Sequence, residues 1–157
     1  MEVKLTSRTE YPALLSPGFS KMSLDQLHEV CVEPFSEERR QLLFENLCLF
    51  LNNLSKLGLV GKVWVDGSFL TEKPEPGDVD ILIVLDSDAC ANLGESQVAA
   101  INAEFSGAKT RYSCDAYTIS DTNSESDIRM RAYWRGLFGY YRDESTPKGI
   151  ALLELSP

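Results

Sequence analysis

An uninterrupted run of branched apolar residues near the middle of the chain sets the first constraint on the fold. Residues 79–86 read VDILIVLD, and the turn-forming segment 74–78, PEPGD, comes directly before them. A short run this rich in Val, Ile and Leu beside a turn signal predicts a buried β-strand. Such a strand requires a sheet that other elements cover.

Helix and strand patterns alternate along the remaining chain. The clearest helix is expected over 36–58, where apolar residues recur at helical spacing, Ser36 can cap the first turn and Gly58 can end the last. Ser23 followed by Gln26 is the capping-box pattern of a short helix. Strands are expected at 62–66, 110–120 and 149–155, a helical turn at 69–73, and helices at 96–106 and 126–138. This order predicts a small α/β (α+β) sheet flanked by helices.

The chain has the length of one domain. We treat its 157 residues as a single unit, 1–157, made of an N-terminal arm with a short helix, 1–35, and a catalytic core, 36–157. No apolar run reaches the roughly 18 residues of a membrane helix. The N-terminus also lacks the apolar segment of a signal peptide. These features predict a cytoplasmic protein without a membrane partner.

Charge and cysteine content narrow the function classes. The formal net charge is −9, which disfavours strong non-specific binding to nucleic acid because that mode uses Lys and Arg to neutralise phosphates. The net charge does not exclude a phosphorylated small molecule, or a nucleic-acid end brought in by metal ions, as the ligand. The four cysteines form no C-x-x-C pair, which favours buried thiols in a reducing compartment over disulfides or zinc. His28 is the one histidine, so no His-cluster metal site exists.

Two acids open the apolar strand. Asp78 and Asp80 are two residues apart, so on a strand they share one face at a spacing of about 7 Å. Left bare, these carboxylates repel each other. An ion-pair partner or a divalent metal relieves the repulsion, and an oxygen-only ligand set suits Mg²⁺. The ordinary alternative is a solvated turn in which the first aspartate caps the loop.

A Gly-Ser pair precedes the two acids. Gly67 and Ser68 lie where the strand 62–66 is expected to turn into a short helix. The start of such a helix has unpaired N–H groups that attract phosphate, glycine allows close approach and serine adds a hydroxyl. Lys73 can reach a phosphate from the same loop, although a solvated lysine is the more common case. Taken alone, Gly67 and Ser68 fit a plain turn equally well.

Asp115 is the third acid of the predicted site. It is the one charged residue in CDAYTI, an otherwise Tyr, Cys, Ala and Ile segment of the strand expected at 110–120. A charge at a half-buried strand position is costly unless it is paired or bound to metal. We expect Asp115 to share a metal and to accept the proton of an attacking hydroxyl. A solitary charge that protects an edge strand is the alternative.

The C-terminal third adds aromatic and basic residues. Core packing is the ordinary role of its aromatics, and stacking on a base or a partner is the alternative. These aromatics are Tyr133, Trp134, Phe138, Tyr140 and Tyr141. Arg142 and Lys148 bracket DESTP, which fits a hairpin-like loop with a structural role.

The combined motif resembles the nucleotidyltransferase superfamily related to DNA polymerase β. Gly67-Ser68, then Asp78-Val79-Asp80 and a later strand acid carry the resemblance, and VWVDGSFLTEKPEPGDVDILIVL is similar to small bacterial nucleotidyltransferase-like proteins of uncharacterised function. The motif covers 62–86, and a looser likeness runs from about 36 to 155. The resemblance implies a mixed sheet, with Mg²⁺ or Mn²⁺ held by Asp78, Asp80 and Asp115 and a nucleoside triphosphate bound at Gly67 and Ser68.

The resemblance also implies a reaction. A nucleoside monophosphate would pass from an NTP to a hydroxyl acceptor with release of pyrophosphate. A cognate protein partner is implied too, because small members of the superfamily occur in toxin–antitoxin or antiphage defence pairs. Two alternatives stay open: a catalytically silent binding module, either antitoxin or scaffold, that keeps the fold, and a nucleotide sensor that binds without transfer.

Overall fold

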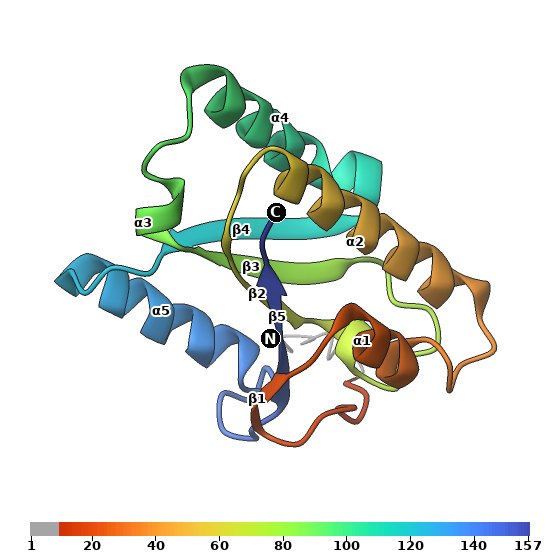
Figure 1. The fold of residues 1–157 in the computed structure, drawn as a ribbon. Helices are drawn as coiled ribbons and strands as arrows, with labels where there is room; N and C mark the ends of the chain where they lie inside the picture. The colour runs from red at the N-terminus through yellow and green to blue at the C-terminus, as the bar shows by residue number, and fades with distance from the viewer. Residues whose placement is uncertain (1–9) are drawn as a thin grey trace, which may run out of the picture.

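A mixed five-stranded sheet forms the centre of the protein (Figure 1). The computed structural model describes residues 10–157. The strands are β1 (Gly18–Lys21), β2 (Gly61–Asp66), β3 (Val79–Leu85), β4 (Cys114–Ser120) and β5 (Gly149–Leu155). They lie in the order β1-β5-β2-β3-β4, with β1 parallel to β5, β4 parallel to β3, and β2 antiparallel to both of its neighbours.

Helices cover both faces of this sheet, with α2 and α4 on one face and α5 on the other (Figure 1). The helices are α1 (Leu24–Cys31), α2 (Glu38–Lys56), α3 (Ser87–Cys90), α4 (Glu95–Tyr112) and α5 (Glu125–Phe138), with one 3₁₀ turn, η1 (Ser68–Leu70). None of the helices in residues 10–157 combines the length and hydrophobicity needed to cross a bilayer. The predicted α/β fold, a small mixed sheet flanked by helices, is confirmed.

Strand β3 is buried on both faces, as its composition predicts. Ile81 and Ile83 point into the larger core beneath α2 and α4, whereas Leu82 and Val84 point into the smaller core beneath α5. Asp80 has the same strand parity as Leu82, so it belongs to the α5 side. The smaller core ends at Leu82 on this strand, and the acidic start of β3 lies beyond it.

The boundary between α4 and β4 differs from the prediction. The helix expected over 96–106 continues to Tyr112, and the strand expected over 110–120 begins only at Cys114. Tyr112 is 2% exposed, and its hydroxyl donates to Glu104 at 2.6 Å and accepts from Asn53 at 3.0 Å. These tertiary contacts hold the last turn in the helix and override the alternating strand pattern.

In the N-terminal half the structure confirms one prediction and differs from the sequence analysis at two places. Ser23 and Gln26 form the predicted capping box of α1. Ser36 does not cap α2, because the cap residue is Glu37 and it makes no side-chain cap bond. Within the predicted arm, residues 18–21 form β1 beside β5, although no apolar strand pattern marks them, and residues 1–9 lie outside the described part.

Two consecutive arginines at the start of α2 hold η1 and the loop 71–78, which joins η1 to β3. The Arg40 side chain is fully buried and stacks on the Phe35 ring at 3.7 Å. It donates at 2.5–3.2 Å to the carbonyl oxygens of Cys31, Phe69, Thr71 and Lys73. Arg39 donates to the carbonyls of Pro76 and Gly77 at 3.3 and 2.5 Å. Burial lowers the pKa of Arg40, so the guanidinium depends on these carbonyls for solvation.

Replacing Arg40 should therefore destabilise the fold strongly. Arg40→Met should lower the free energy of unfolding by about 3 kcal/mol or more, because each buried carbonyl left without a donor costs about 1–3 kcal/mol. Urea unfolding measures this change. Arg129→Met is the matched control, because Arg129 is exposed and forms an open ion pair with Glu125, and it should stay within about 0.5 kcal/mol of the parent. Equal losses in the two variants would contradict the assigned role.

Candidate functional site

Three aspartates form a row across neighbouring strands. Asp66 at the end of β2 is paired in register with Asp80 near the start of β3, and Asp80 is paired with Asp115 near the start of β4. Residues paired in register point to the same face of a sheet, and neighbouring strands lie about 4.8 Å apart. The structure thus brings the sequence-predicted Asp80 and Asp115 together and adds Asp66 on the other side.

Asp78 comes directly before the start of β3. It lies two residues before Asp80 on the same side of the chain. Lys109 on α4 approaches it, with Nζ 3.8 Å from Asp78 Oδ2 and the lysine side chain 71% exposed. A pair this open and this long contributes little to stability.

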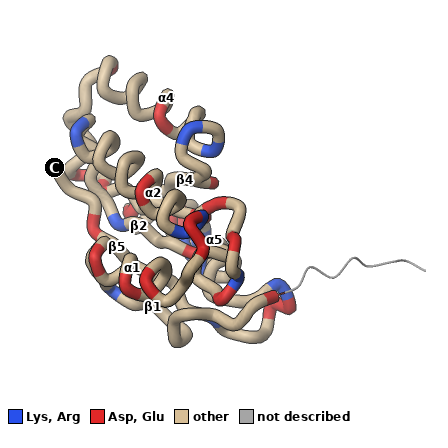
Figure 2. The backbone as a smooth tube through the Cα atoms, turned by 90° about the vertical axis from the view of Figure 1, so that its right-hand side faces the viewer, with Lys and Arg blue, Asp and Glu red and all other residues tan. Residues whose placement is uncertain are grey.

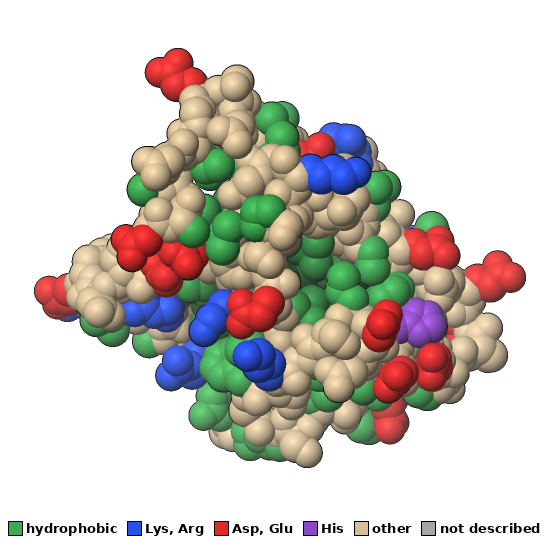
Figure 3. Space-filling model, viewed as in Figure 1, with side chains coloured by type: hydrophobic (Ala, Val, Ile, Leu, Met, Phe, Trp, Pro, Cys, Tyr) green, Lys and Arg blue, Asp and Glu red, His purple; other side chains and the backbone are tan. Residues whose placement is uncertain are grey.

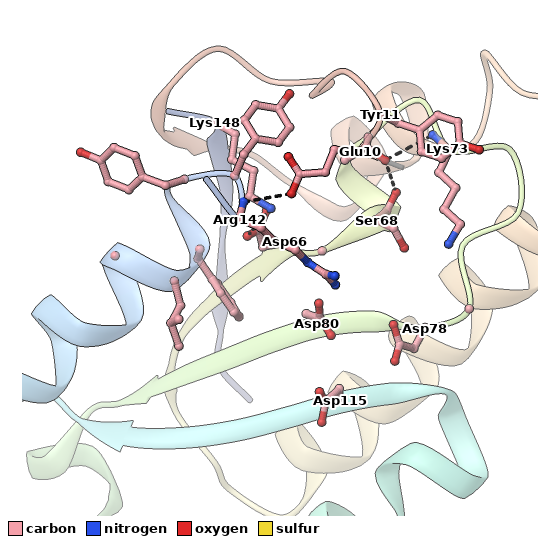
Figure 4. A pocket seen from close by; sticks show the side chains of 18 of the residues that line it. Glu10, Tyr11, Asp66, Ser68, Lys73, Asp78, Asp80, Asp115, Arg142 and Lys148 are labelled. Atoms are coloured by element: carbon pink, nitrogen blue, oxygen red, sulfur yellow. Dashed lines mark hydrogen bonds and ion pairs between the residues drawn. The ribbon is translucent and has the colours of Figure 1, made fainter. Parts of the chain in front are cut away.

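All six predicted site residues line one cleft on the α5 side of the sheet, with a volume of about 1230 Å³ (Figure 4). They are Gly67, Ser68, Lys73, Asp78, Asp80 and Asp115. The opposite wall consists of the C-terminal end of α5 and the loop 139–148. The cleft exceeds the roughly 300–1000 Å³ of ordinary small-molecule sites, so it has room for more than one ligand.

Gly67 is required by its contact with Asp80. It has φ +82°, and a Cβ atom at this position would lie 2.3 Å from Asp80 Oδ2. Only glycine lets the Asp80 carboxylate lie against the turn. The helical turn expected over 69–73 is a single 3₁₀ turn, residues 68–70, so the predicted helix N-terminus for phosphate is much shorter than expected. The half-buried Ser68 hydroxyl remains available at the cleft wall.

Asp66 and Lys148 form a buried pair in the cleft that the sequence analysis missed. Asp66 is 2% exposed, and Lys148 Nζ lies 3.3 Å from its Oδ2 atom, while Oδ1 has no hydrogen-bond partner among residues 10–157. Burial raises the pKa of Asp66 to about 7, and the Lys148 ammonium opposes the rise. Lys148 was expected to serve only the loop that follows α5. One sequence feature could have identified Asp66, namely a charged residue at the end of an apolar strand directly before Gly67.

Asp80, the middle residue of the row, has a raised pKa. Burial, followed by the charges of Asp78 and Asp115, raises the pKa of Asp80 to about 6. Such crowding of carboxylates is costly unless cations neutralise it. Perturbed acids grouped in a cleft are typical of functional sites.

The acids of the cleft offer the type of ligand atom, carboxylate oxygen, that a hard cation prefers. Asp78, Asp80 and Asp115 offer only carboxylate oxygens, the ligands preferred by Mg²⁺ and Mn²⁺. Asp66, whose Oδ1 has no hydrogen-bond partner within residues 10–157, is paired in register with Asp80. As they are placed, no three His, Cys, Asp or Glu side chains of residues 10–157 are gathered into a metal-binding group. Two of the four acids are paired with lysines instead.

A second acidic surface lies on α1 and α2, away from the cleft lining. The histidine, purple in Figure 3, is surrounded by Asp and Glu side chains. His28 is half-buried, contacts Glu33 at 3.5 Å and is hydrogen-bonded to Gln41 at 2.9 Å. Figure 2 shows Lys and Arg dispersed among Asp and Glu along the drawn chain.

Comparison with known proteins gives one match. A family model described as a family of unknown function (DUF6932) matches residues 8–154, which is nearly the whole chain. Neither the curated proteins nor the solved structures gave a match.

The raised pKa of Asp80 makes a prediction about stability and pH. Asp80 binds its proton more tightly in the folded chain, with a pKa of about 6, than in the unfolded chain, with a pKa near 3.8. Its contribution to stability is therefore present below about pH 4 and lost as the pH rises to about 6. Asp80→Asn should raise the melting temperature at pH 8 by about 2–4 °C relative to the parent, roughly the effect of 1 kcal/mol in a domain of this size.

Thermal unfolding in EDTA at pH 4 to 8 measures this difference. The gain of Asp80→Asn over the parent should grow between pH 4 and pH 6 and then level off. Asp88→Asn, an exposed change on α3, should show no such growth. A gain from Asp80→Asn that does not depend on pH would contradict the strained acid row.

Proposed function

The chain belongs to DUF6932, a family of unknown function, and we propose that it is a metal-dependent nucleotidyltransferase. It would move a nucleoside monophosphate from an NTP to a hydroxyl acceptor. The observation that carries the proposal is the row of acids beside Gly67 and Ser68 in one cleft. The resemblance of the motif to the polymerase β-related superfamily supports the same reaction.

Asp78, Asp80 and Asp115 are the residues proposed to hold Mg²⁺ or Mn²⁺. When bound, the metal supplies charge neutralisation for the phosphates and for the acids. Asp78 must leave Lys109 to take part, and the exposed 3.8 Å pair makes this exchange inexpensive. Asp66 is proposed to hold Lys148 in place at the side of the row.

The other cleft residues have roles in binding and proton transfer. Ser68 and Lys73 are proposed to bind the triphosphate, through a hydroxyl and an ammonium group. The acceptor oxygen then forms a bond to the α-phosphorus, while the bond from that phosphorus to the bridging oxygen breaks and pyrophosphate leaves with the electron pair. Asp115 is proposed to take the proton from the acceptor hydroxyl.

A binding module without turnover is the second candidate. The observation that favours it is the pairing of Asp66 and Asp78 with lysines, which neutralises part of the row without a metal. Such a module would bind a partner protein, as antitoxin or scaffold, or sense a nucleotide. Four free cysteines support a cytoplasmic setting for either function, and a cognate protein is the proposed partner. No strong non-specific nucleic-acid binding is expected.

The test of the enzyme proposal uses α-labelled NTPs. The purified chain is incubated with each NTP and Mg²⁺ or Mn²⁺, alone and with the protein encoded beside it, and pyrophosphate and transferred label are measured. Asp80→Asn and Asp115→Asn should each lower the rate by about 10²–10³-fold, the usual effect of removing one group that stabilises developing charge. Lys73→Ala should mainly raise KM, by about tenfold.

Asp88→Asn is the matched control and should keep the parent rate, because Asp88 is exposed on α3 outside the cleft. Metal-dependent NTP binding without pyrophosphate release in any mixture would favour the binding module. Absence of metal-dependent NTP binding would eliminate the enzyme proposal.

Metal binding itself gives a separate prediction. Mn²⁺ added to the chain without nucleotide should lose its free-ion electron paramagnetic resonance signal, and Asp80→Asn should weaken the affinity more than tenfold. Lys109→Ala should strengthen it by about two- to fivefold, since the lysine competes for Asp78 through a weak exposed pair. Lys56→Ala, an exposed change at the end of α2, should have no effect. Affinity that is equal in the parent and Asp80→Asn would contradict the site.

A further inference from the structure

The α5 wall of the cleft carries exposed apolar and aromatic side chains that the proposed chemistry does not use. Tyr133 is 58% exposed, Leu137 49% and Tyr140 41%, and all three line the cleft that contains the acid row. The ordinary expectation for these aromatics was core packing. It holds for Phe138, which is buried in the smaller core, but not for these two tyrosines.

Gly136 lies among these residues. Positions 133, 136 and 137 follow the i, i+3, i+4 spacing of one surface of α5, and Tyr140 lies beyond the end of the helix, in a β-bridge with Pro147. A Cβ atom at Gly136 would meet nothing within 4 Å, so close packing does not explain the glycine. Glycine inside a helix costs stability relative to alanine. The position leaves open space in the cleft that Tyr133 and Tyr140 also line.

We infer that Tyr133, Gly136 and Tyr140 form a shelf on which the nucleobase of the NTP stacks. This inference rests on the proposed function, because the acid row and Ser68 would hold the triphosphate of the same ligand. Tyrosine offers a flat apolar ring with a polar tip, which suits a base at a wet cleft wall. The open space at Gly136 gives the base access to the rings.

The position of the shelf favours a nucleobase over a protein partner. Figure 4 shows the C-terminal end of α5 beside the strands that carry Asp80 and Asp115, so the shelf and the acids belong to one cavity. A ligand that reached the rings and, through bound divalent cations, the acids would combine a flat ring with phosphates, as a nucleotide does. Stacking on aromatic rings tolerates every base because each base has a π-face. The shelf therefore selects nucleotides as a class without choosing one base.

The test compares nucleotides with inorganic tripolyphosphate, which has the phosphates and no base. Calorimetric titration of the full chain with Mn²⁺ should give at least tenfold tighter binding of ATP than of tripolyphosphate. ATP, GTP, CTP and UTP should fall within about tenfold of one another. Tyr133→Ala and Gly136→Leu should each weaken ATP binding by about tenfold and leave tripolyphosphate binding unchanged.

Two controls separate stacking from folding. Tyr133→Phe keeps the ring and should keep the ATP affinity. Ala132→Leu adds the same side chain as Gly136→Leu to an exposed position of α5 that does not line the cleft, and it should also keep the affinity. The melting temperature of Gly136→Leu should not fall, since leucine favours a helix more than glycine does.

The outcomes distinguish this inference from the function on which it rests. Equal binding of ATP and tripolyphosphate in the parent, with no effect of Tyr133→Ala, would overturn the shelf and leave the metal-dependent phosphate site standing. No metal-dependent binding of either ligand would overturn both. Unchanged ATP affinity in Gly136→Leu, together with lost self-association on size-exclusion chromatography, would overturn the shelf and identify the surface as a protein interface.

Discussion

The burial of neighbouring carboxylates in the row of Asp66, Asp80 and Asp115 is the constraint on which the rest of the cleft depends. Carboxylates from three adjacent strands share one face of a sheet, and the middle one is mostly buried. The fold compensates with Lys148 beside Asp66 and with a glycine, Gly67, where any side chain would collide with Asp80. A row of this kind lowers stability, so it is the type of feature that a chain keeps for binding or chemistry.

The loop between the two halves of the motif needs its own support, because residues 72–78 lie in no helix or strand that would satisfy their carbonyl groups. Arg40 provides that support from inside the core, with a planar guanidinium whose five N–H donors can reach several carbonyls at once. Arg39 fixes the outer part. Ser68 on one side and Asp78 on the other are thus held by a helix that contributes no residue to the cleft lining.

Local signals in the sequence were sufficient for part of this arrangement. The density of Val, Ile and Leu in 79–85 predicts a buried strand, and period-two alternation puts Asp78 and Asp80 on one side of it. Strand order and register are set by long-range pairing, so the alignment of Asp66 with Asp80 could not be read from the chain. The pairing of Lys148 with Asp66 could not be predicted either, because the two residues are far apart in the sequence. Arg40 has the sequence pattern of any arginine on a helix surface.

The charges of the cleft lining also bear on how any anionic ligand can enter. Six acidic and four basic side chains line it, so a triphosphate meets a cavity with an excess of negative charge. Its phosphates would be repelled by Asp80 and its neighbours unless divalent cations came with them. Cation and nucleotide affinities are then coupled, and by linkage each must raise the other by the same factor. The lysines at Asp66 and Asp78 would reduce the repulsion that the cations must offset, because they already neutralise part of the row.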